Sequence, residues 1–299
     1  MKGFRKGFWL VFLLLLAGCG PSGPIDLPAL EQKARSGDAA AMERLVRLLG
    51  DPALADRIYP LLIEIGTPAA PALLAHIDTR DAGRREYVIA ALGTLRIAEA
   101  ARPIAAVLAD QTLERRYVAA RALGEIGDPA SVTPLIAALD DPNDEVRRTA
   151  VRALIRLHRG AVPALIEALP GASPQAAGGM IRALGDIGDA RALEVLLAQT
   201  RGTKRADALL ALGRLRDGRA KPVLIAALAD PDWQVRLSAA TALGPIGGPQ
   251  AAAALRRNLD DEVVAVRVWA ARGLEMITGQ PQLYRNARGE MVPPENLYR

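Results

Sequence analysis

This chain has few cysteines and histidines, the residue types most often used to attack a substrate, transfer protons or hold a metal ion. The 299 residues include one cysteine, Cys19, and two histidines, His76 and His158. Nucleophilic catalysis needs a nucleophile beside a base, and a metal site needs several converging His, Cys or carboxylate ligands. No clustered pattern of these residue types accompanies the histidines. The sequence therefore predicts no catalytic residue, no metal site, no cofactor and no small-molecule substrate.

The single cysteine lies in an N-terminal segment with its own pattern. Three basic residues, at positions 2, 5 and 6, precede an apolar run over residues 8–17 that is too short to span a bilayer. The run ends in Leu16-Ala17-Gly18-Cys19, which resembles the lipobox of a bacterial lipoprotein signal. The resemblance implies cleavage before Cys19, attachment of diacylglycerol to its sulfur and acylation of the new amino terminus. An ordinary signal peptide or an uncleaved anchor is the alternative.

This resemblance implies an address for the protein. Residues 1–18 would be the signal peptide, and residues 19–28 the lipidated cysteine with a short tether. Several acyl chains, palmitate among them, hold a protein to a membrane far more firmly than one chain does. We therefore expect the mature chain to be lipid-anchored in the bacterial cell envelope, facing outside the cytoplasm. In a Gram-negative cell, Gly20 in place of an aspartate favours the outer membrane by family analogy.

Most of the net positive charge belongs to this leader. The whole chain has 38 basic and 33 acidic side chains, a formal charge of +5. Removing residues 1–18 removes three basic side chains and no acidic ones, which leaves 35 against 33 and a charge of +2. Such a balanced surface argues against nucleic acid as a partner. The absence of a second cysteine excludes an internal disulfide.

The rest of the chain is a repeat with a period of about 31 residues. A leucine recurs at successive spacings of 30, 31, 31, 30, 28, 31 and 31 residues. The position before it is almost always alanine or glycine, and the position three residues after it is always isoleucine or leucine. Such columns determine packing rather than chemistry. The repeated leucines are Leu62, Leu92, Leu123, Leu154, Leu184, Leu212, Leu243 and Leu274.

One unit, residues 142–169, shows how a repeat folds. Apolar residues from Val146 to Leu157 have the three-and-four spacing of one helix face. His158, Arg159 and Gly160 interrupt this pattern before a second apolar run opens at Pro163. Sister units place Gly-Asp or Asp-Gly at the interruption, which predicts a left-handed helix end and a cap for the next helix. Each unit is therefore predicted to be a helical hairpin that must stack on its neighbours.

The pattern V-R-x-x-A-x-x-A-L-G-x-I-G-D is nearly complete in the units around Arg116 and Arg236. It resembles HEAT-like repeats of the short kind found in phycobilin lyases, over residues 38–278. The resemblance implies an all-α, right-handed α-solenoid of about eight to nine hairpins, which we place at residues 29–278. Residues 279–299 would be a tail that covers the last repeat or binds a partner. The repeats are specific for fold and weak for function.

A column of arginines lies seven residues before the repeated leucine. In the seven units from Leu92 to Leu274 it contains Arg85, Arg116, Arg147, Arg205, Arg236 and Arg267, with Ala177 as the exception. We call these six residues the arginine ladder. The ladder could bind phosphate chains or an acidic partner. We favour a structural role, in which each guanidinium pairs with a turn aspartate such as Asp128, Asp189 or Asp217, or binds carbonyls at helix ends.

An enzyme related to the lyases or hydroxylases of the repeat family, or an enzyme-maturation factor, is the alternative function. The hydroxylase branch uses His-Glu pairs to hold two irons, but Ile77 follows His76 here and Arg159 follows His158. We interpret His158 as a surface turn residue. A groove lined by converging carboxylates would favour the enzyme, whereas a smooth alanine-rich groove would favour a scaffold.

We therefore predict a non-catalytic scaffold that is anchored through Cys19 and binds a protein partner. We place its binding surface on the second helices of the hairpins, on the expectation that these line the concave side. Their outward positions are rich in alanine pairs, which either receive an apolar partner segment or pack between neighbouring helices. An exposed tryptophan on the first turn of a later helix is a further contact candidate. The predicted contact residues are Ala106, Ala138, Glu167, Ala227, Trp233 and Arg256.

Overall fold

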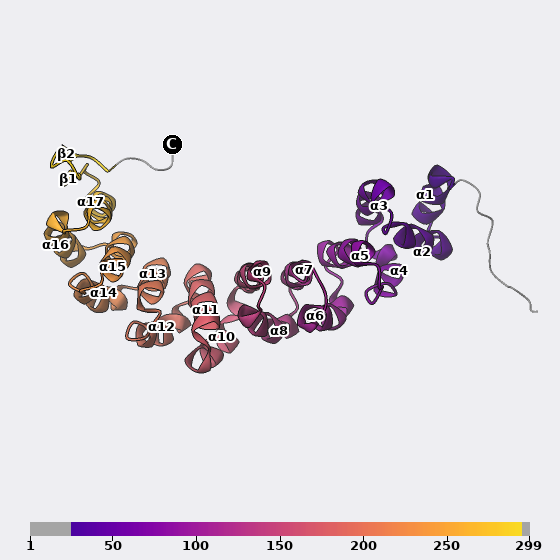
Figure 1. Ribbon diagram of the computed structural model, residues 1–299, viewed down its shortest axis with the longest axis horizontal. Helices are drawn as coiled ribbons and strands as arrows, with labels where there is room; N and C mark the ends of the chain where they lie inside the picture. Colours follow the sequence, from indigo (N-terminus) through magenta and orange to yellow (C-terminus); the bar gives the residue numbers. More distant parts are fainter. Residues whose placement is uncertain (1–24, 295–299) are drawn as a thin grey trace, which may run out of the picture.

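The computed structural model describes residues 25–294, which form an arch built almost entirely of helices (Figure 1). Within these residues, seventeen α-helices follow one another, with short 3-10 segments between them and one β-hairpin at the end. The prediction of an all-α solenoid is confirmed. The signal segment, Cys19 and most of the tether lie outside the described residues, as do residues 295–299.

We call the helices that carry the repeated leucine the first helices and their hairpin partners the second helices. The first helices are α3 (Pro52–Ile65), α5 (Ala82–Thr94), α7 (Tyr117–Ile126), α9 (Asp144–Arg156), α11 (Pro174–Ile187), α13 (Arg205–Leu215), α15 (Trp233–Ile246) and α17 (Val264–Thr278). The second helices are α4 (Ala70–Leu74), α6 (Ala101–Ala109), α8 (Val132–Ala137), α10 (Val162–Ala168), α12 (Leu193–Gln199), α14 (Lys221–Ala227) and α16 (Pro249–Arg257). A hairpin of α1 (Leu27–Arg35) and α2 (Ala39–Leu48) precedes them.

Short 3-10 helices connect these elements. Six precede second helices, namely η1 (Thr67–Ala69), η2 (Ala98–Ala100), η3 (Pro129–Ser131), η5 (His158–Gly160), η7 (Ala190–Ala192) and η8 (Gly218–Ala220). Three follow second helices, namely η4 (Ala138–Asp140), η6 (Leu169–Gly171) and η9 (Asn258–Asp260).

The turn inside each hairpin begins with a left-handed residue four positions after the repeated leucine. From α3 to α15 this position has φ between 49° and 81° in all seven hairpins. Glycine occupies it in four of them, where the missing Cβ removes the steric cost. Arg96, His158 and Arg216 occupy it in the others. His158 is thus an exposed turn residue, and its position reflects the backbone of the repeat.

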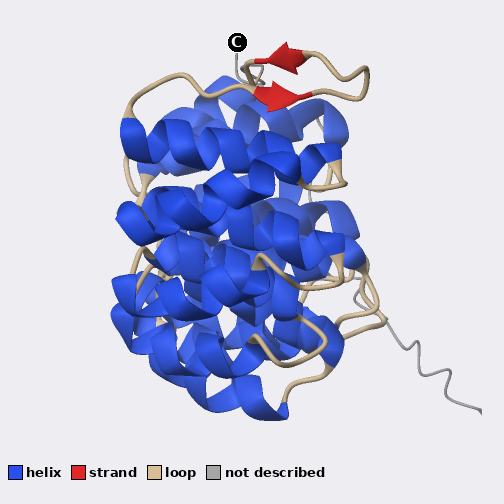
Figure 2. Ribbon diagram, turned by 90° about the vertical axis from the view of Figure 1, so that its left-hand side faces the viewer, coloured by secondary structure: helices blue, strands red, loops and turns tan. Residues whose placement is uncertain are grey.

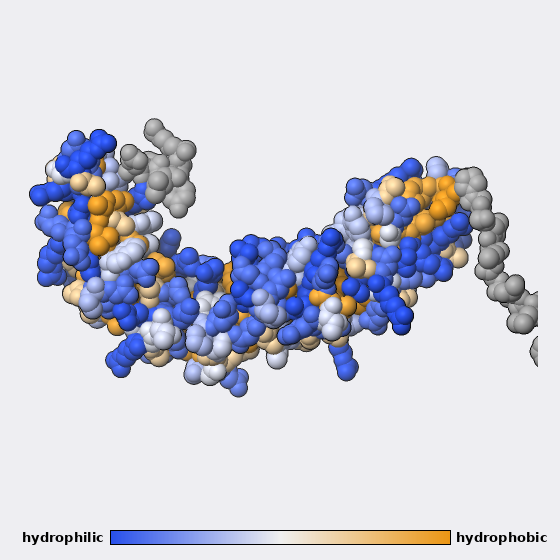
Figure 3. Space-filling view, in the orientation of Figure 1, coloured by the Kyte–Doolittle hydropathy of each residue, from blue (hydrophilic) through white to orange (hydrophobic). Residues whose placement is uncertain are grey.

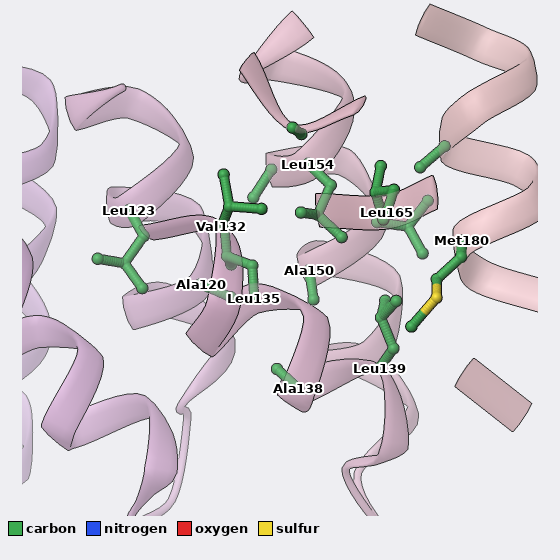
Figure 4. Packing of buried hydrophobic residues seen from close by; sticks show 14 of the residues in the cluster. Ala120, Leu123, Val132, Leu135, Ala138, Leu139, Ala150, Leu154, Leu165 and Met180 are labelled. Atoms are coloured by element: carbon green, nitrogen blue, oxygen red, sulfur yellow. The ribbon is translucent and has the colours of Figure 1, made fainter. Parts of the chain in front are cut away.

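The core is a continuous layer between first and second helices. All eight repeated leucines have no measurable solvent exposure. Figure 4 shows Leu123 and Leu154 of two first helices beside Leu135 and Leu165 of the second helices. Each helix packs only one face against the other helix of its hairpin. The apolar surface that remains is buried by the next hairpin. This arrangement explains why one hairpin alone could not bury its core.

Close packing between successive first helices bends the stack. A Cβ on Gly93, Gly124, Gly185 or Gly213 would lie 2.5–2.8 Å from the Cα of the alanine that precedes the next repeated leucine. Glycine at this position therefore lets two helix backbones touch. Successive second helices contact each other far less extensively than successive first helices do. A stack that is tighter on one side curves toward that side.

The first helices consequently line the concave side of the arch. In Figure 1, α7, α9, α11 and α13 lie on the inner side, and α6, α8, α10 and α12 lie on the outer side. The prediction that the second helices line the concave side is wrong. The repeat pattern identified the two helices of each hairpin correctly. It did not reveal whether successive first helices or successive second helices pack more tightly.

The last repeat lacks a second helix within the described residues. Strands β1 (Tyr284–Arg285) and β2 (Met291–Val292) instead form an antiparallel hairpin that pairs Tyr284 with Val292. This hairpin lies at one end of the stack in Figure 2, and β1 contacts α17 and η9. Nε of Arg267 donates to the carbonyl oxygen of Arg285 at 2.7 Å. The hairpin therefore covers part of the end of the solenoid.

Candidate protein-binding surface

The arginine ladder lies inside the solenoid, between one repeat and the next. Five of its members donate to carbonyl oxygens in the linker just before their own helix, and Arg116 does so to Leu113 O at 3.1 Å. Arg85 donates to Thr79 O (2.9 Å), Arg147 to Asp141 O (2.7 Å) and Pro142 O (3.0 Å), Arg236 to Asp230 O (3.0 Å) and Pro231 O (3.1 Å), and Arg267 to Asp261 O (2.5 Å) and Glu262 O (3.2 Å). These bonds satisfy linker carbonyls that lie outside any helix.

Three ladder arginines also bind the carboxylate of the following linker. Arg116 forms a two-pronged pair with Asp141, and Arg236 forms one with Asp261 at 2.8 and 3.0 Å. The more exposed Arg205 reaches two linker aspartates, each at 3.4 Å. Burial raises the pKa of Asp261, but hydrogen bonds from Arg236 and a backbone amide hold it below its usual value. Each such arginine joins consecutive repeats.

The carboxylates that the sequence suggested as ladder partners do something else. Asp128, Asp189 and Asp217 accept hydrogen bonds from backbone amides and begin the 3-10 helices of the hairpin turns. Arg191 lies two residues after Asp189 and binds both of its carboxylate oxygens. The side-chain bond from Arg191 lowers the pKa of Asp189 to about 2. The ladder partners come from the linkers between hairpins because those linkers approach the first helices.

In each outward alanine pair of the second helices, one alanine is exposed and the other is packed against its neighbours. Ala106 is exposed, Ala138 is buried with 7% exposure and Ala227 is half-buried. Glu167 on α10 and Arg256 on α16 are exposed. These five residues lie on the second helices or directly after one, on the convex side of the arch. They are therefore not in the groove for which they were proposed.

The other predicted contact residue starts a first helix. Trp233 is the first residue of α15, and its side chain is 43% exposed. The histidines are far from it and from each other in the sequence. Nε2 of His76 lies 2.7 Å from Oε1 of Glu43, which is supplied by α2 rather than by a neighbouring residue. Among residues 25–294, no three His, Cys, Asp or Glu side chains form a group that could hold a metal ion.

The concave surface is formed by positions opposite the repeated leucine. A helix turns about 100° per residue, so the positions six before, two before and two after the leucine point away from the second helices. We call them the inner positions. From α3 to α17 they are Asp56, Pro60 and Glu64; Glu86, Ala90 and Thr94; Tyr117, Arg121 and Glu125; Arg148, Arg152 and Arg156; Gly178, Arg182 and Asp186; Ala206, Leu210 and Arg214; Leu237, Thr241 and Pro245; and Val268, Arg272 and Met276.

Three sections with different chemistry follow one another along these positions. The acidic section, on α3 and α5, has three carboxylates and no cation. The basic section, from α7 to α11, has five arginines against Glu125 and Asp186. The apolar section, from α13 to α17, has nine inner positions, of which only Arg214 and Arg272 are charged. Figure 3 shows mostly hydrophilic surface over α7 to α11 and hydrophobic surface over α15 to α17. The groove is thus neither smooth nor uniformly rich in alanine.

Neighbouring repeats already satisfy the acidic section. Glu64 binds Arg35 through bonds of 2.5 and 2.8 Å, and this hydrogen bonding lowers the pKa of Glu64. Glu86 pairs with Arg115, and Asp56 accepts a hydrogen bond from the Tyr87 hydroxyl. The carboxylates of this section therefore already have partners within the chain.

The basic section is satisfied less completely. Arg121 and Arg156 approach the same carboxylate, Glu125, at 3.9 and 3.5 Å. Arg152 lies 3.9 Å from Glu145, and Arg182 has no carboxylate within 4 Å among the described residues. Exposed pairs at such distances are weak and exchange readily with another anion. The basic section is the part of the groove with free capacity for negative charge.

Sequence reasoning missed the inner positions, although their signal was present. The leucine column fixes the phase of every first helix, so the residues at the opposite phase could have been read in order along the chain. The predicted surface was placed on the second helices instead, because the curvature was assigned to the wrong side. The change from charged to apolar residues at α13 would have been visible in the correct column.

Comparison with protein families identifies these repeats. The family model for HEAT repeats matches residues 70–155, 132–203 and 198–275. The chain belongs to the HEAT-repeat family. No curated protein sequence matches this HEAT-repeat protein. Within the described residues, no helix of the HEAT-repeat protein combines the length and apolar character needed to cross a membrane.

Several solved structures are similar to this HEAT-repeat protein. Human deoxyhypusine hydroxylase in complex with glycerol is 26% identical, with 86% of this chain and 100% of that chain covered and a TM-score of 0.36. The CpcE and CpcF complex of phycocyanin lyase from Nostoc sp. PCC7120 is 28% identical, with 69% and 86% covered and a TM-score of 0.37. An engineered protein is 20% identical, with 86% and 80% covered and a TM-score of 0.43.

Proposed function

We propose that this HEAT-repeat protein is a non-catalytic scaffold, lipid-anchored in the bacterial cell envelope, which binds a protein partner on its concave surface. HEAT repeats generally mediate protein-protein interactions. The observation that carries the proposal is the inner face of the first helices, where side chains that are not needed for packing form ordered charged and apolar sections. A long open surface of this kind suits an extended contact with another chain.

The charged groups of the groove support binding more than catalysis. The carboxylates Asp144 and Asp186 at its centre are engaged by arginines at 2.6–3.1 Å. Engaged carboxylates of this kind serve poorly as proton donors or acceptors. Similarity to a hydroxylase and a lyase does not by itself transfer their activities to this chain, because the site of each enzyme would have to be matched residue by residue.

Site-specific photocrosslinking in the native envelope tests the binding surface. A photoreactive residue placed at Arg152 or Met276 should form covalent adducts with a partner, because both side chains are exposed on the inner face. The same residue placed at Ala137 or Ala226, which are exposed on second helices, is the matched control. Adducts that form only from the two convex positions would contradict a concave binding surface.

The proposed anchor has a separate test. The protein should incorporate labelled palmitate, and Cys19→Ala should abolish incorporation and leave unprocessed precursor, because no other cysteine can receive the diacylglycerol. Cys19→Ser provides a second variant with a similar shape. Normal processing of either variant, or a wild-type protein without label, would show that the N-terminal segment is not a lipoprotein signal.

A further inference from the structure

The regular pattern of the solenoid is interrupted between α9 and α11. The glycine that follows the repeated leucine in most first helices is replaced by Ile155, and the ladder arginine is replaced by Ala177. α9 and α11 consequently contact each other less extensively than α7 and α9 do. The linker before α11 also lacks an aspartate in the position of Asp141 or Asp261. Two devices that hold other repeats together are therefore absent here.

An open cleft of about 400 Å³ lies at this interruption. Gly178 and Gly179 leave its floor without side chains, and a Cβ on Gly178 would meet only the end of Lys204 and the Asp207 carboxylate, at 3.6–3.9 Å. The cleft is lined by side chains from α9, α11 and α13, by Leu139 of η4 and by Lys204, the residue before α13. It opens on the inner face, where the basic section meets the apolar section.

Cations outnumber carboxylates around this cleft. Arg147, Arg148, Arg152, Arg182 and Lys204 line it, together with Asp144, Asp186 and Asp207. Asp144 is bound by Arg147 and Arg148, and Asp186 by Arg214. Arg182 and Lys204 have no carboxylate within 4 Å in the described part of the chain. Two cations on the walls of one cleft are thus available to an external anion.

The apolar section begins beside this cleft and extends to the end of the solenoid. Leu210, Leu237 and Val268 are half-buried at inner positions of three successive first helices, and Met276 is 62% exposed. Apolar side chains at solvent-facing positions gain about 25 cal/mol for each Å² that a partner removes from water. A partner that reaches from the cleft to α17 would cover both kinds of surface.

We propose that the cleft and the apolar section together bind one amphipathic helical segment of a partner protein, with acidic residues at one end and an apolar face along the rest. The proposal rests on the proposed scaffold function and names the partner's chemistry. Charge complementarity places the acidic end at Arg182 and Lys204. Three steps of about 8–10 Å separate α11 from α17, which corresponds to roughly 18 residues of α-helix at about 1.5 Å each.

Fluorescence anisotropy with synthetic peptides tests this inference on the full acylated chain in nanodiscs of zwitterionic lipid. The acidic probe is a helix-forming peptide of about 18 residues with glutamates at one end and leucines on one face. A neutral probe carries glutamine in place of each glutamate, and a polar probe carries serine in place of each leucine. The acidic probe should bind tightest, and its affinity should fall as salt is raised.

Variants separate the cleft from general charge effects. Arg182→Glu should weaken the acidic probe about tenfold, equivalent to about 1.4 kcal/mol, and should leave the neutral probe unchanged. Gly178→Leu should also weaken it, because the new side chain occupies the cleft without removing a charge. Arg102→Glu, on the exposed face of α6, is the matched control and should have no effect. Circular dichroism checks that each variant is folded.

The outcomes distinguish this inference from the proposed function. Equal binding of the acidic and neutral probes, or an Arg182→Glu variant that binds normally, would overturn the inference. Displacement of the acidic probe by vesicles of anionic phospholipid would also overturn it, since the site would then recognise headgroups. If no probe binds while concave photocrosslinks still form, the inference fails and the scaffold function stands. If crosslinks form only on the convex side, both fail.

Discussion

Replacing Arg116 with alanine should lower the free energy of unfolding by about 3 to 5 kcal/mol, because it leaves a buried carboxylate without its counter-charge. The Arg116 and Asp141 side chains are 6% and 5% exposed. Arg116 also donates to the carbonyl oxygens of Leu108 and Leu113, at 3.3 and 3.1 Å. Its loss would disconnect α7 from the linker before α9. Urea denaturation followed by circular dichroism measures the change, and hydrogen exchange localises it.

Alanine substitutions of two other arginines provide reference values for the loss of stability in Arg116→Ala. Arg148→Ala removes an exposed pair with Asp144 and should cost no more than about 1 kcal/mol. Arg147→Ala removes bonds to two carbonyls and one exposed carboxylate, so an intermediate cost of about 1 to 3 kcal/mol is expected. The double variant Arg116→Ala, Asp141→Ala should recover part of the single loss. A loss for Arg116→Ala no larger than that for Arg148→Ala would show that the buried pair does not hold the repeats together.

Gly213→Ala should destabilise the protein by about 1 to 3 kcal/mol, although helix propensity alone predicts a gain of about 1 kcal/mol. A Cβ on Gly213 would lie 2.5 Å from the Cα of Ala242 and 2.6 Å from its Cβ. The obstacle is backbone, which cannot rotate away as a flexible side chain can. The helices α13 and α15 must therefore separate, and the curvature at this point should decrease. Thermal denaturation measures the stability, and small-angle scattering measures the change in shape.

Gly160→Ala is the matched control for the close approach. Gly160 lies in η5, where a Cβ would have no atom within 4 Å, and its φ is outside the left-handed region. Alanine there should be neutral or slightly stabilising, because it only restricts the unfolded chain. If Gly213→Ala raised the melting temperature as much as Gly160→Ala did, α13 and α15 would not be in backbone contact.

Both predictions depend on pairs of contacting residues, and the sequence identified only one member of each pair. The small residue before each repeated leucine was recognised as a position that determines packing. The glycine that follows the repeated leucine was not recognised. It contacts the small residue of the next repeat. In the same way, the ladder arginines were recognised, but their carboxylate partners were sought in the turns of the hairpins. The partners lie in the linkers, about 25 residues further along the chain for Arg116 and Arg236.

The sequence by itself determined the repeat, the two helices of each hairpin, the turn between them and the residues that form the core. These features follow from local spacing, because a helix of known period must bury the face on which its leucines lie. It also identified Cys19 as the expected point of attachment, which stays a prediction because it lies outside the described residues. Only the tertiary structure decided which helices are concave. Curvature depends on the difference in spacing between two rows of helices, and that difference arises from contacts between residues of adjacent repeats rather than from any one helix.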